Sequence, residues 1–357
     1  MHTCIDAVIL AEGSRAADYI LASAHRVALL KALDPLDPRD FVTMTQALAK
    51  RLKRAALPPE KDLVKRALQE VDVDWVNLTA AQRSKALDGL NNVLAGLAQK
   101  RLKAMPVLHA EAPRIVKGTR TSTIRTYKLG IPKATSFDKK LARSVSAMQS
   151  NFITDEAGNI VDNTAAWARD QVGVLSGAGL DSTDIAEQLS KGISARTLGK
   201  ASNYWNVVAV TFSNRARTWE QMVAYDEAKI VAYLWESVLD KRTTEICRFM
   251  HGKRFRVSDA LGKFASAEDA AKQGGARGLK DTQPWLTMSR NADNQPTIVT
   301  RTSGRTHTLA VVDDAGFGEV DKIGNYSSAA SLQTLADLGV SAPPAHGLCR
   351  SVTVADV

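Results

Sequence analysis

The chain has 357 residues, enough for two or three domains with hydrophobic cores of their own. Hydrophobic residues make up 45% and charged residues 24%, as in an ordinary globular protein. No run of about 18 apolar residues and no secretory leader pattern is present, so we expect neither a membrane span nor secretion. The three cysteines, Cys4, Cys247 and Cys349, are too widely spaced for a disulfide framework and indicate a reducing cytoplasm or a particle assembled there.

Residues 1–106 are predicted to form a helical domain. Ala, Leu, Lys and Gln dominate this region, and prolines punctuate it. Thr79 and Gln82 have the spacing of a capping box, and the apolar residues that follow recur at intervals of three and four. We therefore expect a helix with one buried face from this point to about Met105.

Residues 107–136 lack helical periodicity and contain several prolines and glycines, so we expect an extended basic arm or linker. Between residues 112 and 143 nine basic side chains accompany one acidic side chain, which places +8 of the total net charge of +9 in this stretch. Localised positive charge attracts polyanions, although a solvated linker would explain it equally well. No nucleic-acid-binding motif is present, so any DNA contact would be independent of base sequence. The candidate contact residues are Arg114, Lys117, Arg120, Arg125, Lys128, Lys133, Lys139, Lys140 and Arg143.

Helices are expected again over residues 137–228. Asp181 and Asp184 form a second capping signal for a short helix, and a long helix should span residues 203–226 or so. Three tryptophans in and after this region, Trp205, Trp219 and Trp235, could stack on bases, but their placement favours the core.

Residues 229–357 are predicted to form a small α+β module. "KIVAYLWESVLD" is rich in β-branched and aromatic residues and predicts a strand over residues 230–239. "GKRFRV" predicts a second strand, and "TIVTRTSGRTHTLAVV" predicts a hairpin that turns at Ser303 and Gly304. "CRSVTVAD" predicts a closing strand. The fold class is therefore mainly α, followed by a small α+β C-terminal module.

Two cysteine–histidine pairs lie at opposite ends of this module. Cys247 and His251 follow the first strand, and His346 and Cys349 precede the last one. Two thiolates and two imidazoles suit tetrahedral zinc, and a metal that joins both segments would stabilise so small a module. The alternative is that both cysteines are buried apolar residues and that the histidines are ordinary hydrogen-bonding groups.

Three stretches in order, "SNRARTWEQ", "YLWESVLDKRTTEICRFMHGKRF" and "PPAHGLCRSV", resemble the C-terminal domain of tailed-phage head-morphogenesis proteins of the phage Mu minor-head type. The resemblance covers about residues 165–357. Ser351 stands where that family has its last cysteine, and residues 260–340 are expected to form an insertion specific to this chain. The residues that match the family pattern are Arg217, Thr218, Asp240, Arg242, Thr243, Cys247, His251, His346, Cys349 and Arg350.

This resemblance implies a non-enzymatic minor capsid protein with no catalytic residues, present in few copies inside the head. The implied partners are the portal protein, the capsid or scaffold interior and the packaged DNA, with no membrane. The implied location is the virion interior, and the host cytoplasm during assembly. The implied roles are head assembly, DNA packaging or DNA delivery, with the basic residues facing DNA or the portal.

Two other classes of function stay open. One is a zinc-dependent nuclease or toxin-like enzyme, with His251 or His346 as general base and Arg350 stabilising a phosphate. Four zinc ligands would close the coordination sphere and oppose this reading. The other is a DNA-binding adaptor with no role in the head. Asp240 and Arg242 are expected to form an ion pair that fixes the end of the strand, rather than an active-site pair.

Overall fold

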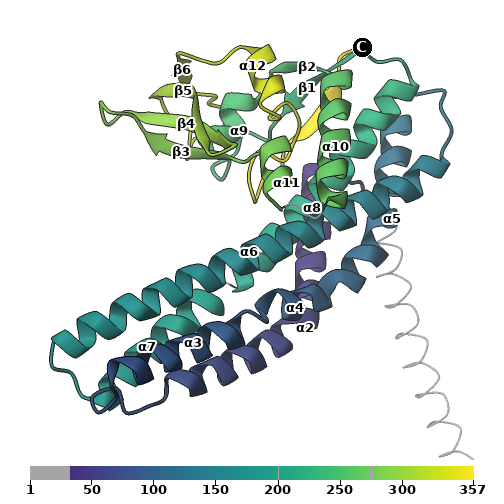
Figure 1. Cartoon of the computed structure of the whole chain (residues 1–357). Coiled ribbons are helices and arrows are strands. Elements are labelled where there is room, and N and C mark those ends of the chain that lie inside the picture. Colours follow the sequence, from purple (N-terminus) through teal and green to yellow (C-terminus); the bar gives the residue numbers. More distant parts are fainter. Residues whose placement is uncertain (1–32, 200, 274–275) are drawn as a thin grey trace, which may run out of the picture.

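The computed structural model describes residues 33–199, 201–273 and 276–357. A long helical region comes first and a small α+β module follows, which confirms the predicted fold class (Figure 1). Cys4 lies outside the described residues. No helix among the described residues is both long enough and apolar enough to cross a membrane. The elements before the first strand are α2 (Pro38–Val71), α3 (Ala80–Leu94), α4 (Leu97–Arg101), a short 3₁₀ turn (Leu102–Ala104), α5 (Met105–Tyr127), α6 (Ser136–Gly177), α7 (Ser182–Thr197) and α8 (Ala201–Glu227).

The expected extended arm is mostly helix, because α5 occupies Met105–Tyr127. Pro106 lies in its first turn, where a proline costs little, and Pro113 is tolerated inside it. Ile115 and Val116 are 1% exposed and belong to the main core. Burial of this apolar face outweighs the local proline and glycine signals, so the prediction of an extended conformation was wrong for residues 107–127.

Both predicted capping signals are confirmed. Thr79 and Gln82 form the reciprocal capping box of α3, and the Asp181 side chain accepts a hydrogen bond from the Asp184 N–H at the start of α7. The first of these helices is shorter than expected, since α3 ends at Leu94 and is followed by α4 and the 3₁₀ turn. The second is longer than expected and continues to Thr197.

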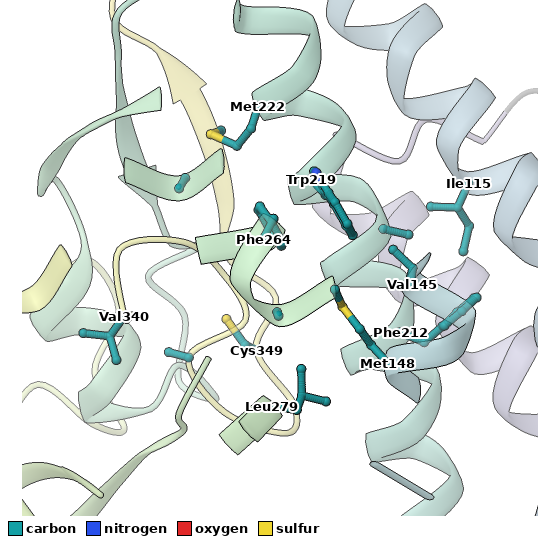
Figure 2. Packing of buried hydrophobic residues seen from close by; sticks show 14 of the residues in the cluster. Ile115, Val145, Met148, Phe212, Trp219, Met222, Phe264, Leu279, Val340 and Cys349 are labelled. Atoms are coloured by element: carbon teal, nitrogen blue, oxygen red, sulfur yellow. The ribbon is translucent and has the colours of Figure 1, made fainter. Parts of the chain in front are cut away.

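Two hydrophobic cores share the same long helices. The first halves of α2 and α6 pack into the main core with α5, α8 and the C-terminal module, whereas their second halves pack with α3, α4 and α7 into a second core. Figure 1 shows this second group as an elongated arm that leads away from the module. Trp219 of α8 stacks on Phe264 at 4.9 Å between ring centroids, where the helices meet the module (Figure 2). The division of the chain into domains at residues 106 and 136 stays a prediction.

The C-terminal module contains two antiparallel sheets, of order β2-β1-β7 and β3-β4-β5-β6. The expected hairpin is present, with Ser303 and Gly304 both at positive φ in its turn. Residues 260–340 contain the second sheet, α11, α12 and most of α10, and that they form an insertion stays a prediction. The module consists of β1 (Ala232–Glu236), α9 (Glu245–Met250), β2 (Arg254–Arg256), α10 (Val257–Lys272), α11 (Ala276–Thr282), β3 (Leu286–Arg290), β4 (Pro296–Thr302), β5 (Arg305–Asp314), β6 (Asn325–Ser327), α12 (Leu332–Asp337) and β7 (Val352–Ala355).

Candidate metal centre

Strand pairing brings the two cysteine–histidine segments together. β7 runs antiparallel to β1, with Glu236 opposite Val352, so the end of β1 lies beside the start of β7. The chain that leaves β1 enters α9, and the chain that reaches β7 passes through residues 343–351. The two segments are about 100 residues apart in sequence and meet at this edge because of the sheet register.

Three of the four predicted ligands form one cluster. The ligand atoms of Cys247, His346 and Cys349 all lie within 4.8 Å of one another. The two sulfurs are 3.8 Å apart, which is about the separation that tetrahedral zinc with bonds of about 2.3 Å imposes. His346 Nε2 is 3.0 Å from Cys247 Sγ. This distance fits a hydrogen bond between the ring nitrogen and the sulfur and would widen by about half an ångström around a metal.

Burial and mutual contact set the protonation of the two thiols. Burial raises the pKa of Cys349, but the hydrogen bond from Cys247 and the charge of His346 outweigh it, and the pKa lies well below its ordinary value. The pKa of Cys247 is raised well above its ordinary value, first by that same hydrogen bond and then by burial. The two pKa values thus move in opposite directions, and Cys349 is the thiol that ionises more readily to the thiolate, the form that ligates metals.

His251 is not part of this cluster. Its Nδ1 accepts a hydrogen bond of 3.2 Å from the Ser237 N–H and lies 3.8 Å from a Glu236 carboxylate oxygen. The hydroxyl of Ser351 hydrogen-bonds both thiols and lowers the pKa of each. The described residues thus supply three strong ligands, Cys247, His346 and Cys349, and these would hold a metal if one bound.

One contact opposes metal binding by His346. Its Nδ1 accepts a hydrogen bond of 3.3 Å from the Leu348 N–H, which places the ring proton on Nε2 in the neutral tautomer. A metal bound at Nε2 needs that nitrogen free, so the Leu348 contact would have to be given up. The Thr244 hydroxyl, 3.0 Å from Nε2, is then left without this partner too.

The matched residues beside the cluster form an ion-pair network. Arg350 donates to both carboxylate oxygens of Asp240, at 2.9 and 2.7 Å. Arg242 is 3.6 Å from the same carboxylate but is mostly exposed, so the expected Asp240–Arg242 pair is present and secondary. The Thr243 hydroxyl donates to Asp240 at 3.0 Å. A small cavity of about 110 Å³ lies against these residues and the cluster.

One face of α8 holds the closing segment in place. Asn214, Arg217, Gln221 and Tyr225 recur at the spacing of a single helix face and donate to the backbone carbonyls of Cys349, Ser351 and Thr353. The Thr218 hydroxyl donates to the Asn214 amide oxygen, which orients that amide. These contacts join two of the sequence motifs, "SNRARTWEQ" on α8 and "PPAHGLCRSV" before β7, in the folded chain.

Sequence reasoning missed most of this polar core. Only Arg217 and Thr218 were singled out, although the spacing of polar residues along α8 was a readable signal. Arg248 was also missed. It is fully buried and donates to the carbonyls of Thr243, Asp240, Glu319 and Lys322, where nothing in the sequence distinguishes it from a surface arginine.

The nine basic candidates do not share one environment. Arg120 is fully buried and donates to Glu220 at 2.8 Å, so its side chain is not on the surface. Arg125 pairs with Asp34, and Arg114 and Lys140 have acidic neighbours at 3.6 Å. Five exposed cations on α5, the following turn and the start of α6 have no ion-pair partner among the described residues: Lys117, Lys128, Lys133, Lys139 and Arg143. The three tryptophans are core residues, at 3% exposed or less.

The fold and cluster define a helical protein with a small sheet module closed by a cysteine–histidine clasp, meaning residues 343–351 and α9. Residues 169–272 match the family of phage Mu protein F like proteins. The match covers α7, α8, β1, α9, β2 and α10, and it confirms the resemblance seen in the motifs; "PPAHGLCRSV" lies outside the matched residues. Searches of curated proteins and of solved structures return no match.

Proposed function

We propose that this chain is a minor head protein of a tailed phage that acts at the portal vertex. The match of residues 169–272 to the phage Mu protein F family carries this proposal. Arg217 and Thr218, which match the family pattern, take part in the hydrogen bonds that join α8 to the segment before β7. The family pattern therefore includes residues that hold the C-terminal module together. A low-copy assembly role needs such a module together with surfaces for partners.

The five unpaired cations supply the surface toward DNA or an acidic portal. They lie at the end of the helical region that is next to the module, and the second core lies at the opposite end (Figure 1). Electrostatic binding of this kind needs no base readout, consistent with the absence of a recognition motif.

The cysteine–histidine cluster serves, in this proposal, as a structural zinc site. Both thiols are buried, at 4% and 0% exposed, as expected of a closed structural centre. A zinc ion bound by three ligands alone would keep one coordination position open. The number of ligands is therefore no longer an argument against a catalytic zinc site. The stronger argument is Arg350: both of its terminal nitrogens are taken by Asp240, which leaves it unsuited to stabilise a phosphate.

Co-expression with the portal protein of the same phage tests the portal role. A tagged portal should retain this chain at low salt, and a variant with Lys133 and Lys139 changed to glutamate should be retained less. No retention at any salt concentration would remove the portal from the proposal. DNA binding measured on the same preparations separates the two partners.

A further inference from the structure

A cavity of about 830 Å³, which none of Cys247, His346 and Cys349 lines, lies where α6, α8, α11 and the β4–β5 hairpin meet. Phe152 and Trp285, whose rings are 5.4 Å apart, form an aromatic wall. Leu279 and Pro284 add apolar surface. The volume is that of ordinary ligand sites, and the apolar wall stands beside a larger number of polar and charged side chains.

An arginine without a carboxylate partner lines this cavity. Arg215 of α8 is 2% exposed, and its Nε donates to the Gln283 side-chain oxygen at 2.9 Å. Among the described residues no acidic group lies within ion-pair distance of it, and its Nη1 has no hydrogen-bond partner. Burial lowers the pKa of Arg215 to about 10, so the guanidinium stays charged at neutral pH. A buried charge of this kind is costly unless an anion accompanies it.

The remaining charged side chains of the cavity limit which kind of anion could bind beside Arg215. Three acids line it, but Lys280 pairs with Asp155 and with Glu156, and Asp281 accepts the Ser303 N–H. Arg301, exposed on the hairpin, is the second cation without an ion-pair partner among the described residues. A nucleic acid or a phosphate dianion would meet these carboxylates, whereas a single negative charge on an apolar body would meet less repulsion.

We propose that this cavity binds a carboxylate carried on an aromatic or aliphatic group, with Arg215 as the charge partner and the Phe152–Trp285 wall as the apolar contact. Gln283, already fixed by Arg215, offers an amide donor beside it. The carboxylate can belong to a small acid or to the free C-terminus of a partner chain. The inference does not depend on the head role or on zinc.

The test is an NMR titration of the full chain that follows the Trp285 indole N–H, assigned with Trp285→Phe. The probes are benzoate for the small-acid arm and the N-acetylated peptide Gly-Gly-Phe with a free C-terminus for the peptide arm. Benzamide and the amidated peptide are the matched neutral controls. At least one acid should shift the signal at millimolar concentration, and its amide should not.

Two variants locate the charge partner. Arg215→Met should weaken binding at least about tenfold, since it removes a charge-assisted pair. Arg301→Ser, on the surface, should weaken binding by a smaller factor, and Arg305→Ser on the same hairpin but outside the cavity should not. If Arg215→Met fails to fold, two comparisons still test the proposal. One is each acid against its amide, and the other is Arg301→Ser against Arg305→Ser. No shift with either acid, or equal shifts with acids and amides, would overturn the proposal.

Discussion

Arg350 donates two hydrogen bonds to the carboxylate of Asp240, and this pair joins the end of β1 to the segment that leads into β7. The two residues are 110 positions apart and flank the two halves of the cysteine–histidine clasp. The pair therefore closes the module whether or not a metal is bound.

Replacing Asp240 with asparagine should destabilise the module by about 1–2 kcal/mol at pH 7, because a bidentate charge-assisted pair is lost. The hydrogen bonds from Arg350 hold the pKa of Asp240 well below its ordinary value. Stability from this pair is thus present above the unfolded pKa of about 3.9 and is lost as the pH falls through the folded pKa. Urea unfolding at pH 7 and at progressively lower pH measures both effects. The exposed Asp293→Asn is the control, and equal losses in the two variants would contradict this assignment.

Glu220 should make the protein less stable as the pH rises. Burial raises the pKa of Glu220 to about 8, and Arg120 does not offset this because its charge is shared with Glu227 and Asp138. The folded state then holds more protons than the unfolded state between about pH 4.5 and pH 8, so the free energy of unfolding falls across that window and levels off above it. Glu220→Gln mimics the protonated form.

The measurement for Glu220 is urea unfolding of wild type and Glu220→Gln at pH 5.5 and 8.5. The variant should flatten the pH dependence by an amount on the order of 1 to a few kcal/mol. Identical slopes in the two proteins would mean that Glu220 is ionised throughout, as a simple ion pair with Arg120 would require.

Zinc should bind at a single site per chain, and Cys349→Ser should abolish it. The same substitution should lower the melting temperature of the module, and a chelator should lower that of the wild type to a similar value. Ser351→Cys should tighten zinc binding, because it supplies a thiolate beside the two existing ones. Metal content by mass spectrometry and thermal melts with and without chelator check these outcomes, with Cys4→Ser as the control. A metal-free wild type that chelator does not affect would leave the cluster as a packed hydrogen-bonded pair.

Charge reversal at Lys128, Lys133 and Lys139 should weaken DNA binding and reduce its dependence on salt. Each lost phosphate contact lowers the slope of log K against log salt by about 0.9 on duplex DNA. Filter binding at several salt concentrations measures both quantities. Reversal of Lys61, Lys65 and Lys85, which are exposed around the second core, is the matched control. An equal loss in both triple variants would indicate only the effect of net charge.

The sequence predicted the order of helices and strands well where periodicity and capping were strong. The capping residues Thr79 and Asp181, the hairpin turn at Ser303 and the closing strand were all readable locally. α5 was not, because Pro113 lies inside the helix, where it is tolerated only since the apolar face of the helix is buried. Tertiary burial decides such cases, and a local window does not contain it.

Part of the candidate site could be predicted from the sequence, and the rest depends on contacts between distant segments. The spacing of Cys247 and of His346 with Cys349 indicated a cluster, and the register of β1 and β7 then brought these residues together. His251 shares the sequence spacing but hydrogen-bonds Ser237 instead. Arg120 and Arg125 read as surface charges, yet one is buried with Glu220 and the other is paired with Asp34, because partners about 90 to 100 residues away are invisible to a local reading.

We propose that this chain is a low-copy component of the phage head at the portal vertex. Quantitative mass spectrometry of purified virions and procapsids, with the amount of the chain normalised to the portal subunit, tests this role. We expect a few copies of the chain per portal ring, in mature particles or in procapsids. Absence from both, despite expression in infected cells, would rule out a low-copy head role and would favour a test of the cysteine–histidine clasp as an enzyme site.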